Sequence, residues 1–315
     1  MDRLLEATRR AEQRHFWFRG FRAFVRPLIA EAVTGRPSPK ILDCGCGTGA
    51  NLVMLSEYGR PYGFDVSWQG LQFARGYGQT RIARASITRI PFPDAVFDVV
   101  TVFDVLYSLS EEQESAAVQE VFRVLRPDGS LIVNVAALRI LRGSHSVFGA
   151  ELRRSTRRRL RALLSRYGFD VVRLTYTNFV LFPLMLAVRT AQRAMGLATP
   201  EEAGVDIAVP PALFNDTLAG LLQLEAHALR RVDMPIGSSL LCVARRPSTF
   251  REPQGRPERG RGTTNSGRPE AVEGRPPSGQ ERHRQEVGRD AGQDRARRGS
   301  DEKAPEEGRE EIQSL

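Results

Sequence analysis

The chain has 315 residues, of which 41% are hydrophobic, enough to form a buried core. Its formal net charge of +9 would attract anionic partners, but no nucleic-acid-reading motif accompanies the charge, so we expect no specific nucleic-acid partner. Three cysteines are too few for a disulfide framework or a four-ligand zinc site, which predicts a reducing, cytoplasmic environment.

The N-terminal part of the chain predicts one amphipathic helix. Residues 1–20 lack a continuous apolar core and a small-residue cleavage site, so we expect no secretory signal. Residues 16–33 carry apolar side chains at helical spacing, and this pattern stops before Gly35 and Pro37. We therefore expect residues 1–36 to form a helical segment ahead of the main domain.

From Lys40 onward, short apolar runs alternate with helical patterns, which is typical of βα units. The expected strands are residues 40–44, 61–65, 80–83, 97–103, 130–136, 169–176 and 238–244. The expected helices are residues 50–58, 68–77, 111–125 and 156–167. Parallel strands need a crossover, usually a helix, to return the chain, so this alternation predicts an α/β fold with a mostly parallel sheet. We expect the core of this fold in residues 37–178 and its last strand in residues 237–246.

The alternation breaks after residue 176, where about 60 residues separate the last two expected strands. This stretch holds the apolar run FVLFPLMLAV at residues 179–188 and an amphipathic helix at 213–230. The run contains Pro183 and is shorter than the roughly 20 residues needed to span a bilayer. We expect residues 179–236 to form a helical cap that packs on the sheet and shapes a substrate pocket.

The C-terminal part of the chain, residues 247–315, has hardly any large apolar side chain. From residue 248 onward it carries 14 acidic and 14 basic residues, so the net charge belongs to the part before it. Such a segment cannot bury enough apolar surface to offset its ordering entropy, which predicts a disordered charged tail.

The strongest motif is the sequence ILDCGCGTG at residues 41–49. Glycines spaced in this way between a buried strand and a helix let the backbone approach a ligand where a Cβ atom would collide. Read from Gly45 to Ala50, the turn also fits the dinucleotide pattern G-x-G-x-x-A. Asp43 precedes the turn, where a carboxylate can meet a positive group, and Asp65 closes the second strand, where it can accept both hydroxyls of a ribose.

The region from residue 40 to 136 resembles the class I S-adenosylmethionine-dependent methyltransferases, in particular the group related to ubiquinone and menaquinone biosynthesis enzymes. The matching segments, in order, are LDCGCGTG, YGFDVS, IPFPDAVFDVVTVFDVLYSL and EVFRVLRPDGSLIVNV. The resemblance implies a Rossmann-like seven-stranded sheet with helices on both faces, S-adenosylmethionine as cofactor and methyl transfer as activity. An NAD(P)-dependent oxidoreductase is the weaker alternative, because a dehydrogenase should not carry the IPFPDAVFD and RVLRPDG segments.

The resemblance also implies a set of cofactor-binding residues, namely Asp43, Gly45, Cys46, Gly47, Gly49, Asp65, Val66, Ser86, Ile87 and Phe103. The glycine turn would lie against the methionine and ribose of the cofactor, with Asp43 near the amino group. Asp65 would hold the ribose hydroxyls, and Val66 would lie beside the adenine. Taken singly, Asp43 also fits a capping or turn carboxylate, and Asp65 an ordinary strand-end residue.

The remaining positions show two departures from the family pattern. Ser86 and Ile87 would flank the adenine edge, and Phe103 and Asp104 would border the transferred methyl group. Relatives usually have an acidic residue where this chain has Ser86, whose hydroxyl accepts a hydrogen bond without charge assistance. They often have histidine where this chain has Ser108. These departures keep open a methyltransferase-like module that binds the cofactor but has lost catalysis.

Methyl transfer from a sulfonium is an in-line displacement, so alignment and exclusion of water provide the catalysis, and we assign no metal ligands. A hydroxyl acceptor benefits from a general base. The candidate base is His145, on a loop after the fifth strand that should face the cofactor, and Asp104 and Tyr107 are further catalytic candidates. Some bacterial relatives carry a stretch similar to the one around His145, with an acidic residue after the histidine where this chain has Ser146. The alternative for His145 is a solvated or capping role.

Three further features bear on the acceptor. Arg153 and Arg154 could clamp a phosphate or carboxylate, although such an arginine run is more often a solvated helix face. The aromatic cluster at residues 15–18, with Phe21 and Phe24, fits both a cover over a sulfonium cation and simple packing on the sheet. The cap has more apolar side chains than the binding of a polar metabolite needs. We therefore hypothesise a small-molecule acceptor that is apolar or lipid-linked, and a peripheral membrane contact. The alternative is that the two helices of the cap fill their own core. The sequence indicates no oligomeric state.

Overall fold

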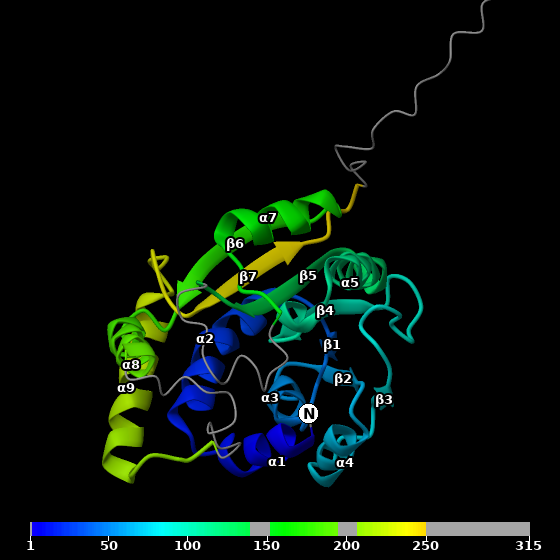
Figure 1. Cartoon of the computed structure of the whole chain (residues 1–315). Coiled ribbons are helices and arrows are strands. Elements are labelled where there is room, and N and C mark those ends of the chain that lie inside the picture. The colour runs from blue at the N-terminus through cyan, green and yellow to red at the C-terminus, as the bar shows by residue number, and fades with distance from the viewer. Residues whose placement is uncertain (1, 139–151, 195–206, 250–315) are drawn as a thin grey trace, which may run out of the picture. The chain divides into compact units, whose positions relative to one another are not determined.

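A seven-stranded sheet lies between two layers of helices in the computed structural model (Figure 1). The described residues are 2–138, 152–194 and 207–249, all within the unit Met1–Glu258. The candidate base His145 and residues 250–315 of the predicted tail lie outside the described residues.

The sheet has the strand order β3-β2-β1-β4-β5-β7-β6. Its strands are β1 Lys40–Cys44, β2 Arg60–Asp65, β3 Ile82–Arg84, β4 Phe97–Phe103, β5 Leu125–Ala136, β6 Asp170–Thr177 and β7 Ser239–Arg245. The first five strands pair in parallel, whereas β7 pairs antiparallel with both β5 and β6. The predicted mostly parallel sheet is therefore confirmed, and the reversal is confined to its last strand.

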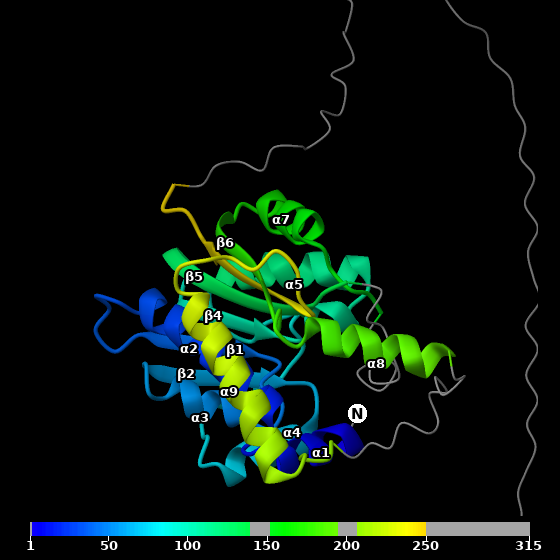
Figure 2. The ribbon, with the colours of Figure 1, turned by 90° about the vertical axis from the view of Figure 1, so that its left-hand side faces the viewer.

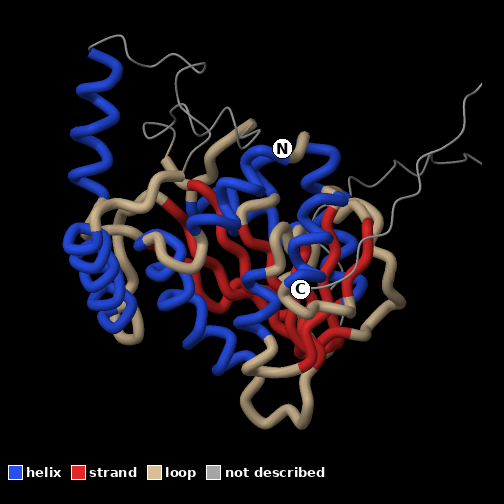
Figure 3. The backbone as a smooth tube through the Cα atoms, turned by 90° about the horizontal axis from the view of Figure 1, so that it is seen from below, coloured by secondary structure: helices blue, strands red, loops and turns tan. Residues whose placement is uncertain are grey.

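The helices follow the predicted order along the chain. They are α1 Asp2–Ala11, α2 Phe16–Ala32, α3 Ala50–Leu55, α4 Trp68–Gly76, η1 Leu106–Ser108, α5 Glu111–Val124, α7 Arg157–Arg166, α8 Phe182–Ala194 and α9 Ala212–Ala228. Helices α5 and α7 pack on one face of the sheet, and α2, α3 and α9 pack on the other. The view from below shows helices on both sides of the strands (Figure 3).

The central strand β4 explains why both faces are covered. All seven of its residues are buried. Because successive side chains point to opposite faces, Val100 and Val102 enter the core below α5, whereas Val99 and Phe103 enter the core below α2. A strand that is apolar on both faces needs a helix layer on each side, and this need sets the three-layer arrangement.

The observed elements differ most from the predicted ones at two places, the start of β5 and the helix α1 that precedes the predicted helix at residues 16–33. β5 begins at Leu125 rather than at residue 130. Its polar residues 126–129 remain in the strand because the pairing with β4 shifts register there, and Asp128 takes a φ of +61°. The N-terminal segment forms two helices rather than one. His15 separates them, since its Nδ1 accepts a hydrogen bond from the Trp17 N–H (3.2 Å) and caps α2.

The two helices between β6 and β7 form the predicted helical insertion. α9 packs along α2, whereas α8 extends away from the sheet (Figure 2). Two buried polar side chains hold α9 in place: Asn215 accepts the Phe16 N–H (2.8 Å), and Glu225 accepts the Phe179 N–H (2.9 Å). Of the helices that the described residues form, none is both long and apolar enough to cross a membrane.

Candidate functional site

The glycine turn is hydrogen-bonded to the carboxyl end of the neighbouring strand β2. Gly45 and Cys46 donate their N–H groups to the carbonyl oxygen of Phe64 at 2.9 and 3.0 Å. The Asp65 carboxylate accepts the Gly47 N–H (2.8 Å) on one oxygen and the Ser67 N–H (2.8 Å) on the other. The structure thus brings Asp65 to the glycine turn, as predicted, and the carboxylate organises the turn in addition to any ligand contact.

Two of the three glycines of the turn, Gly45 and Gly49, cannot be replaced by larger residues without displacing their neighbours. Gly45, Gly47 and Gly49 have φ values of +77°, +50° and +83°, in the left-handed region that favours glycine. A Cβ atom on Gly45 would lie 2.5 Å from Val105 Cγ2, and one on Gly49 would lie 2.6 Å from Ala74 Cβ. The turn is therefore packed tightly between the end of β4 and helix α4.

Asp43 is the most unusual carboxyl group of the site. It is 1% exposed, and the Thr101 hydroxyl donates to its Oδ1 at 2.6 Å. Its Oδ2 is buried without a hydrogen-bond partner among the described residues. Burial raises the pKa of Asp43 to about 7, against the Thr101 hydrogen bond and with the added charge of Asp65. An unpartnered buried carboxyl oxygen beside a glycine turn is suited to a cationic group.

The residues predicted to contact an adenine differ in exposure. Val66 is half exposed, whereas Ile87 is buried in the core below α5. The Ser86 hydroxyl is hydrogen-bonded to the Thr88 hydroxyl (2.8 Å) and also accepts the Thr88 N–H (3.2 Å). The thiol of Cys46 is buried and packs below the turn, and burial raises its pKa, so the reactive thiolate form is disfavoured there.

The predicted catalytic residues that the structure describes lie directly after β4. Asp104 is exposed, has a φ of +59°, and its Oδ1 accepts a hydrogen bond from Asn134 Nδ2 at 3.0 Å. Tyr107 is half-buried in η1, and its carbonyl oxygen accepts the Leu152 N–H (2.9 Å). The positive φ of Asp104 is uncommon for a residue with a side chain, and residues in such conformations cluster at functional sites.

The aromatic side chains of α2 reach the same end of β4. The Phe21 ring lies edge-to-face on the Phe103 ring, with centroids 5.0 Å apart. Phe24 is buried in the core below α2. This part of the predicted aromatic cluster therefore packs on the sheet.

The N-terminal helix α1 contacts the glycine turn through a carboxylate that the sequence did not reveal. Glu12, directly after α1, is buried and accepts hydrogen bonds from the Thr48 hydroxyl (2.6 Å) and the Tyr77 hydroxyl (2.9 Å). Burial raises the pKa of Glu12, although both hydroxyls oppose that shift. Leu5 of α1 also approaches the turn, 3.4 Å from where a Cβ on Gly47 would lie. The start of the chain thus covers one side of the turn.

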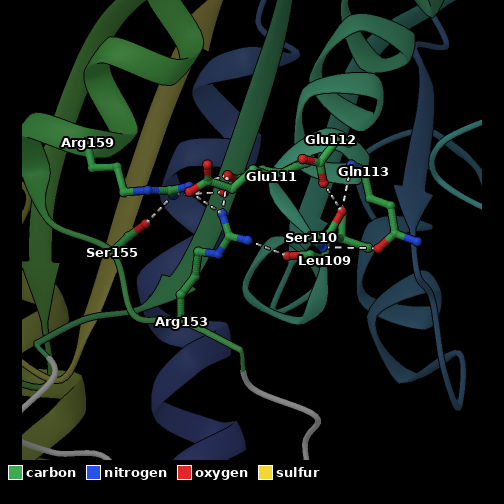
Figure 4. Close-up of polar contacts among 9 residues, drawn as sticks. Leu109, Ser110, Glu111, Glu112, Gln113, Arg153, Ser155 and Arg159 are labelled. Carbon is green, nitrogen blue, oxygen red and sulfur yellow. Dashed lines mark hydrogen bonds and ion pairs between the residues drawn. The ribbon is translucent and has the colours of Figure 1, made fainter.

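Of the two arginines considered as a clamp, Arg153 belongs to an internal ion-pair cluster (Figure 4), whereas Arg154 donates a hydrogen bond to the carbonyl oxygen of Ala137 (3.1 Å). Arg153 reaches Glu114 at 3.2 Å and Glu111 at 3.4 Å, and it donates to the carbonyl oxygen of Leu109 at 2.9 Å. Arg159 pairs with the same buried Glu114. Arg153 and Arg159 thus pair with a buried acid of α5 rather than forming a solvated helix face.

Replacement of Glu114 by alanine is expected to lower the free energy of unfolding by about 2–4 kcal/mol, because two arginines lose a buried partner. The matched control is Glu111→Ala, whose side chain is 79% exposed and whose removal is expected to cost less than about 0.5 kcal/mol. Urea unfolding of both variants measures the difference. Equal losses in the two would show that the cluster contributes no more than a surface ion pair.

Some of these residues had a sequence signal, and others had none. Thr101 and Asn134 are buried polar residues within the apolar runs of β4 and β5, and such an interruption could have been recognised as a site signal. Glu12 stands in a charged stretch, EATRRAEQR, where nothing distinguishes it from exposed neighbours. Its burial depends on how α1 packs against α4.

Comparisons with known proteins agree with this geometry. Residues 42–133 match the family model described as a methyltransferase domain. A demethylmenaquinone methyltransferase from Mycolicibacterium vanbaalenii is 34% identical over 113 residues, which cover 35% of this chain and 47% of that protein. The ubiquinone/menaquinone biosynthesis C-methyltransferase UbiE from Vibrio parahaemolyticus is 31% identical over 109 residues, covering 31% of this chain and 41% of that protein. The chain thus spans less than half the length of these curated relatives.

One solved structure extends the comparison beyond the matched domain. It is a chain from a complex between the Haloferax volcanii Trm112 methyltransferase activator and a methyltransferase, with 20% identity and a TM-score of 0.51. The alignment covers 78% of this chain and 96% of that chain. At this identity the likeness shows a shared fold.

Proposed function

We propose that the protein transfers a methyl group from S-adenosylmethionine to a small-molecule acceptor, on the premise that residues 42–133 match the model of a methyltransferase domain and that the matched relatives are methyltransferases. The observation that carries the proposal is the buried, unpartnered Oδ2 of Asp43 beside the glycine turn. A dehydrogenase is disfavoured, because the matched domain and the matched relatives are methyltransferases.

The described residues fit this cofactor. The ammonium of its methionine part is the kind of donor that the free oxygen of Asp43 needs, and pairing with a cation would stabilise the ionised carboxyl group. The turn has no Cβ at three positions, which lets the backbone lie close to a ligand. Asp65 keeps lone pairs beyond the two N–H groups that it accepts, and these can accept ribose hydroxyls.

Bound S-adenosylmethionine would supply an electrophilic methyl group on a sulfonium. The role of this chain is then to align the acceptor with that group and to exclude water, which can account for about 7–11 kcal/mol of the barrier. Phe103, packed under Phe21, would form an apolar wall of the site. Asp104, which accepts a hydrogen bond from Asn134, would orient an acceptor or accept its proton, and Tyr107 lies three residues further along the chain.

For the acceptor, we propose an apolar or lipid-linked molecule. The support is the surface of α8 and α9, where Leu184, Val188, Leu213, Phe214 and Leu224 are exposed; Leu213 is 78% exposed and Phe214 is 66% exposed. Large apolar side chains grouped on one insertion are typical of a surface that contacts apolar partners. The alternative, in which the two helices fill their own core, is weakened because these side chains face solvent.

The test is a transfer assay with methyl-labelled S-adenosylmethionine and either a lipid extract or an aqueous extract as acceptor source. We expect label to enter a lipid-extractable product. Label in the aqueous fraction alone would contradict the apolar acceptor but support the methyltransferase. Cofactor binding without any transfer would support a module that has lost catalysis, and absence of binding would contradict the proposed function altogether.

A further inference from the structure

A second polar site lies at the amino ends of the strands, the edge of the sheet opposite to the glycine turn. A hollow of about 500 Å³ opens there, lined by the loop Gly35–Ser38 and by Lys40, Arg60, Asp98 and Arg126. Lys40 begins β1, Arg60 begins β2, and Asp98 and Arg126 are the second residues of β4 and β5. The proposed methyl transfer does not use any of these residues.

The centre of the hollow is the buried carboxylate of Asp98, and all of its contacts are accounted for. Its Oδ1 accepts from Arg36 Nη1 (3.1 Å) and Arg126 Nη1 (3.0 Å), and its Oδ2 accepts the Lys40 N–H (2.8 Å). Burial alone would raise the pKa of Asp98, but these three donors outweigh it and lower the pKa. The carboxylate therefore stays ionised and holds two guanidinium groups in fixed positions.

The other two cations of the hollow have no acidic partner. Lys40 and Arg60 are register partners on adjacent parallel strands, so their side chains leave the same face of the sheet. In the ranges that the structure describes, neither side chain forms an ion pair with a carboxylate. Four basic residues against one ionised acid leave the hollow with an excess of three positive charges.

We propose that this hollow binds the phosphate group of a phosphorylated small molecule. Guanidinium groups that Asp98 already holds lose little side-chain entropy on binding, and their remaining N–H groups match the oxygens of a phosphate. Lys40 and Arg60 add charge that no protein carboxylate neutralises. A multiply charged anion is favoured over a carboxylate because the excess charge is three rather than one.

The test is calorimetric titration of the full chain with inorganic diphosphate at fixed ionic strength, with chloride as the only other anion. We expect saturable binding of one diphosphate per chain. The double variant Lys40→Ala and Arg60→Ala should weaken binding at least 10-fold, because it removes both unpaired cations and leaves the Asp98 cluster in place. The control Arg158→Ala removes an arginine of α7 that is exposed, as Arg60 is, and should leave the affinity unchanged.

Two results would overturn the proposal: absence of saturable binding to the unmodified chain, or an equal loss in the Arg158 control, which would indicate a general effect of net charge. Titration of the same samples with S-adenosylmethionine keeps the outcome separate from the proposed function. The double variant should bind that cofactor as the unmodified chain does, since the hollow and the glycine turn lie at opposite edges of the sheet.

Discussion

Replacement of Asp43 by asparagine is expected to weaken the binding of S-adenosylmethionine by about 10- to 150-fold, the equivalent of about 1.5–3 kcal/mol for a hydrogen bond to a charged group. Asparagine has nearly the same size, and its oxygen can still accept the Thr101 hydroxyl. The variant therefore removes the negative charge while it preserves the packing. Equilibrium titration of both proteins at pH 8 measures the effect.

The same residue predicts a pH dependence. Because the pKa of Asp43 is raised to about 7 in the folded chain, its carboxyl group is mostly protonated at pH 6 and must lose that proton to pair with an ammonium. The affinity of the unmodified chain should therefore fall as the pH drops below about 7, towards a tenfold loss per pH unit. The Asp43→Asn variant should lack this dependence.

The pH dependence of the folding stability has the opposite direction to that of cofactor binding. A carboxyl group whose pKa is raised on folding contributes stability that is fully present below its unfolded value of 3.8 and is lost as the pH rises through about 7. Without cofactor, Asp43→Asn should therefore be at least as stable as the unmodified chain at pH 8, as urea unfolding would measure. The exposed Asp170→Asn serves as control and should change neither property. An unchanged affinity in Asp43→Asn would contradict the assigned role.

The second large effect is expected from Gly49→Ala, which should lower the free energy of unfolding by about 2–5 kcal/mol. The φ of +83° costs about 1–2 kcal/mol for a residue with a Cβ atom. The new Cβ would also lie 2.6 Å from Ala74 Cβ and 2.7 Å from its Cα, which forces α4 to shift and adds about 1–3 kcal/mol. Because α4 packs on the turn, we expect weaker cofactor binding in the same variant.

Gly35→Ala is a matched control for this variant. Gly35 has a similar φ of +74°, but no atom lies within 4 Å of the position that its Cβ would take. Its replacement should therefore cost only the conformational part, about 1–2 kcal/mol. Urea unfolding of the two variants separates conformational strain from close packing. A loss in Gly49→Ala no larger than in Gly35→Ala would show that α4 does not press on the turn as described.

The positions of the glycine turn and its two acids were predictable because local pattern and topology agree there. An apolar strand followed by a glycine turn and a helix shows where the carboxyl ends of the parallel strands lie. Asp43 lies near the carboxyl end of β1, and Asp65 lies at the carboxyl end of β2. The four segments that carry the family resemblance all lie in this part, and the matched domain covers the same residues. Position along parallel strands was therefore enough to bring these side chains to one edge.

Residues outside these strands were harder to assign. Glu12, Glu114 and Asp98 look like ordinary surface acids in the sequence, yet each is buried and hydrogen-bonded to residues 28 or more positions away. Nothing local marks such an acid, because its burial depends on which helix or strand covers it. The ion pair of Arg153 was not predicted for the same reason, since its partner Glu114 on α5 is adjacent only in the folded chain.

The sequence by itself determined the order of elements, the parallel part of the sheet and the glycine turn with its two acids, because these follow from apolar periodicity and from backbone conformations that only glycine adopts readily. The tertiary structure alone decided which charged side chains become buried partners. It also decided that Asp43 keeps one oxygen unpaired and that four basic residues meet at the opposite edge. The physical reason is that ion pairing and desolvation depend on distances between segments remote in the chain, and such distances leave no local pattern.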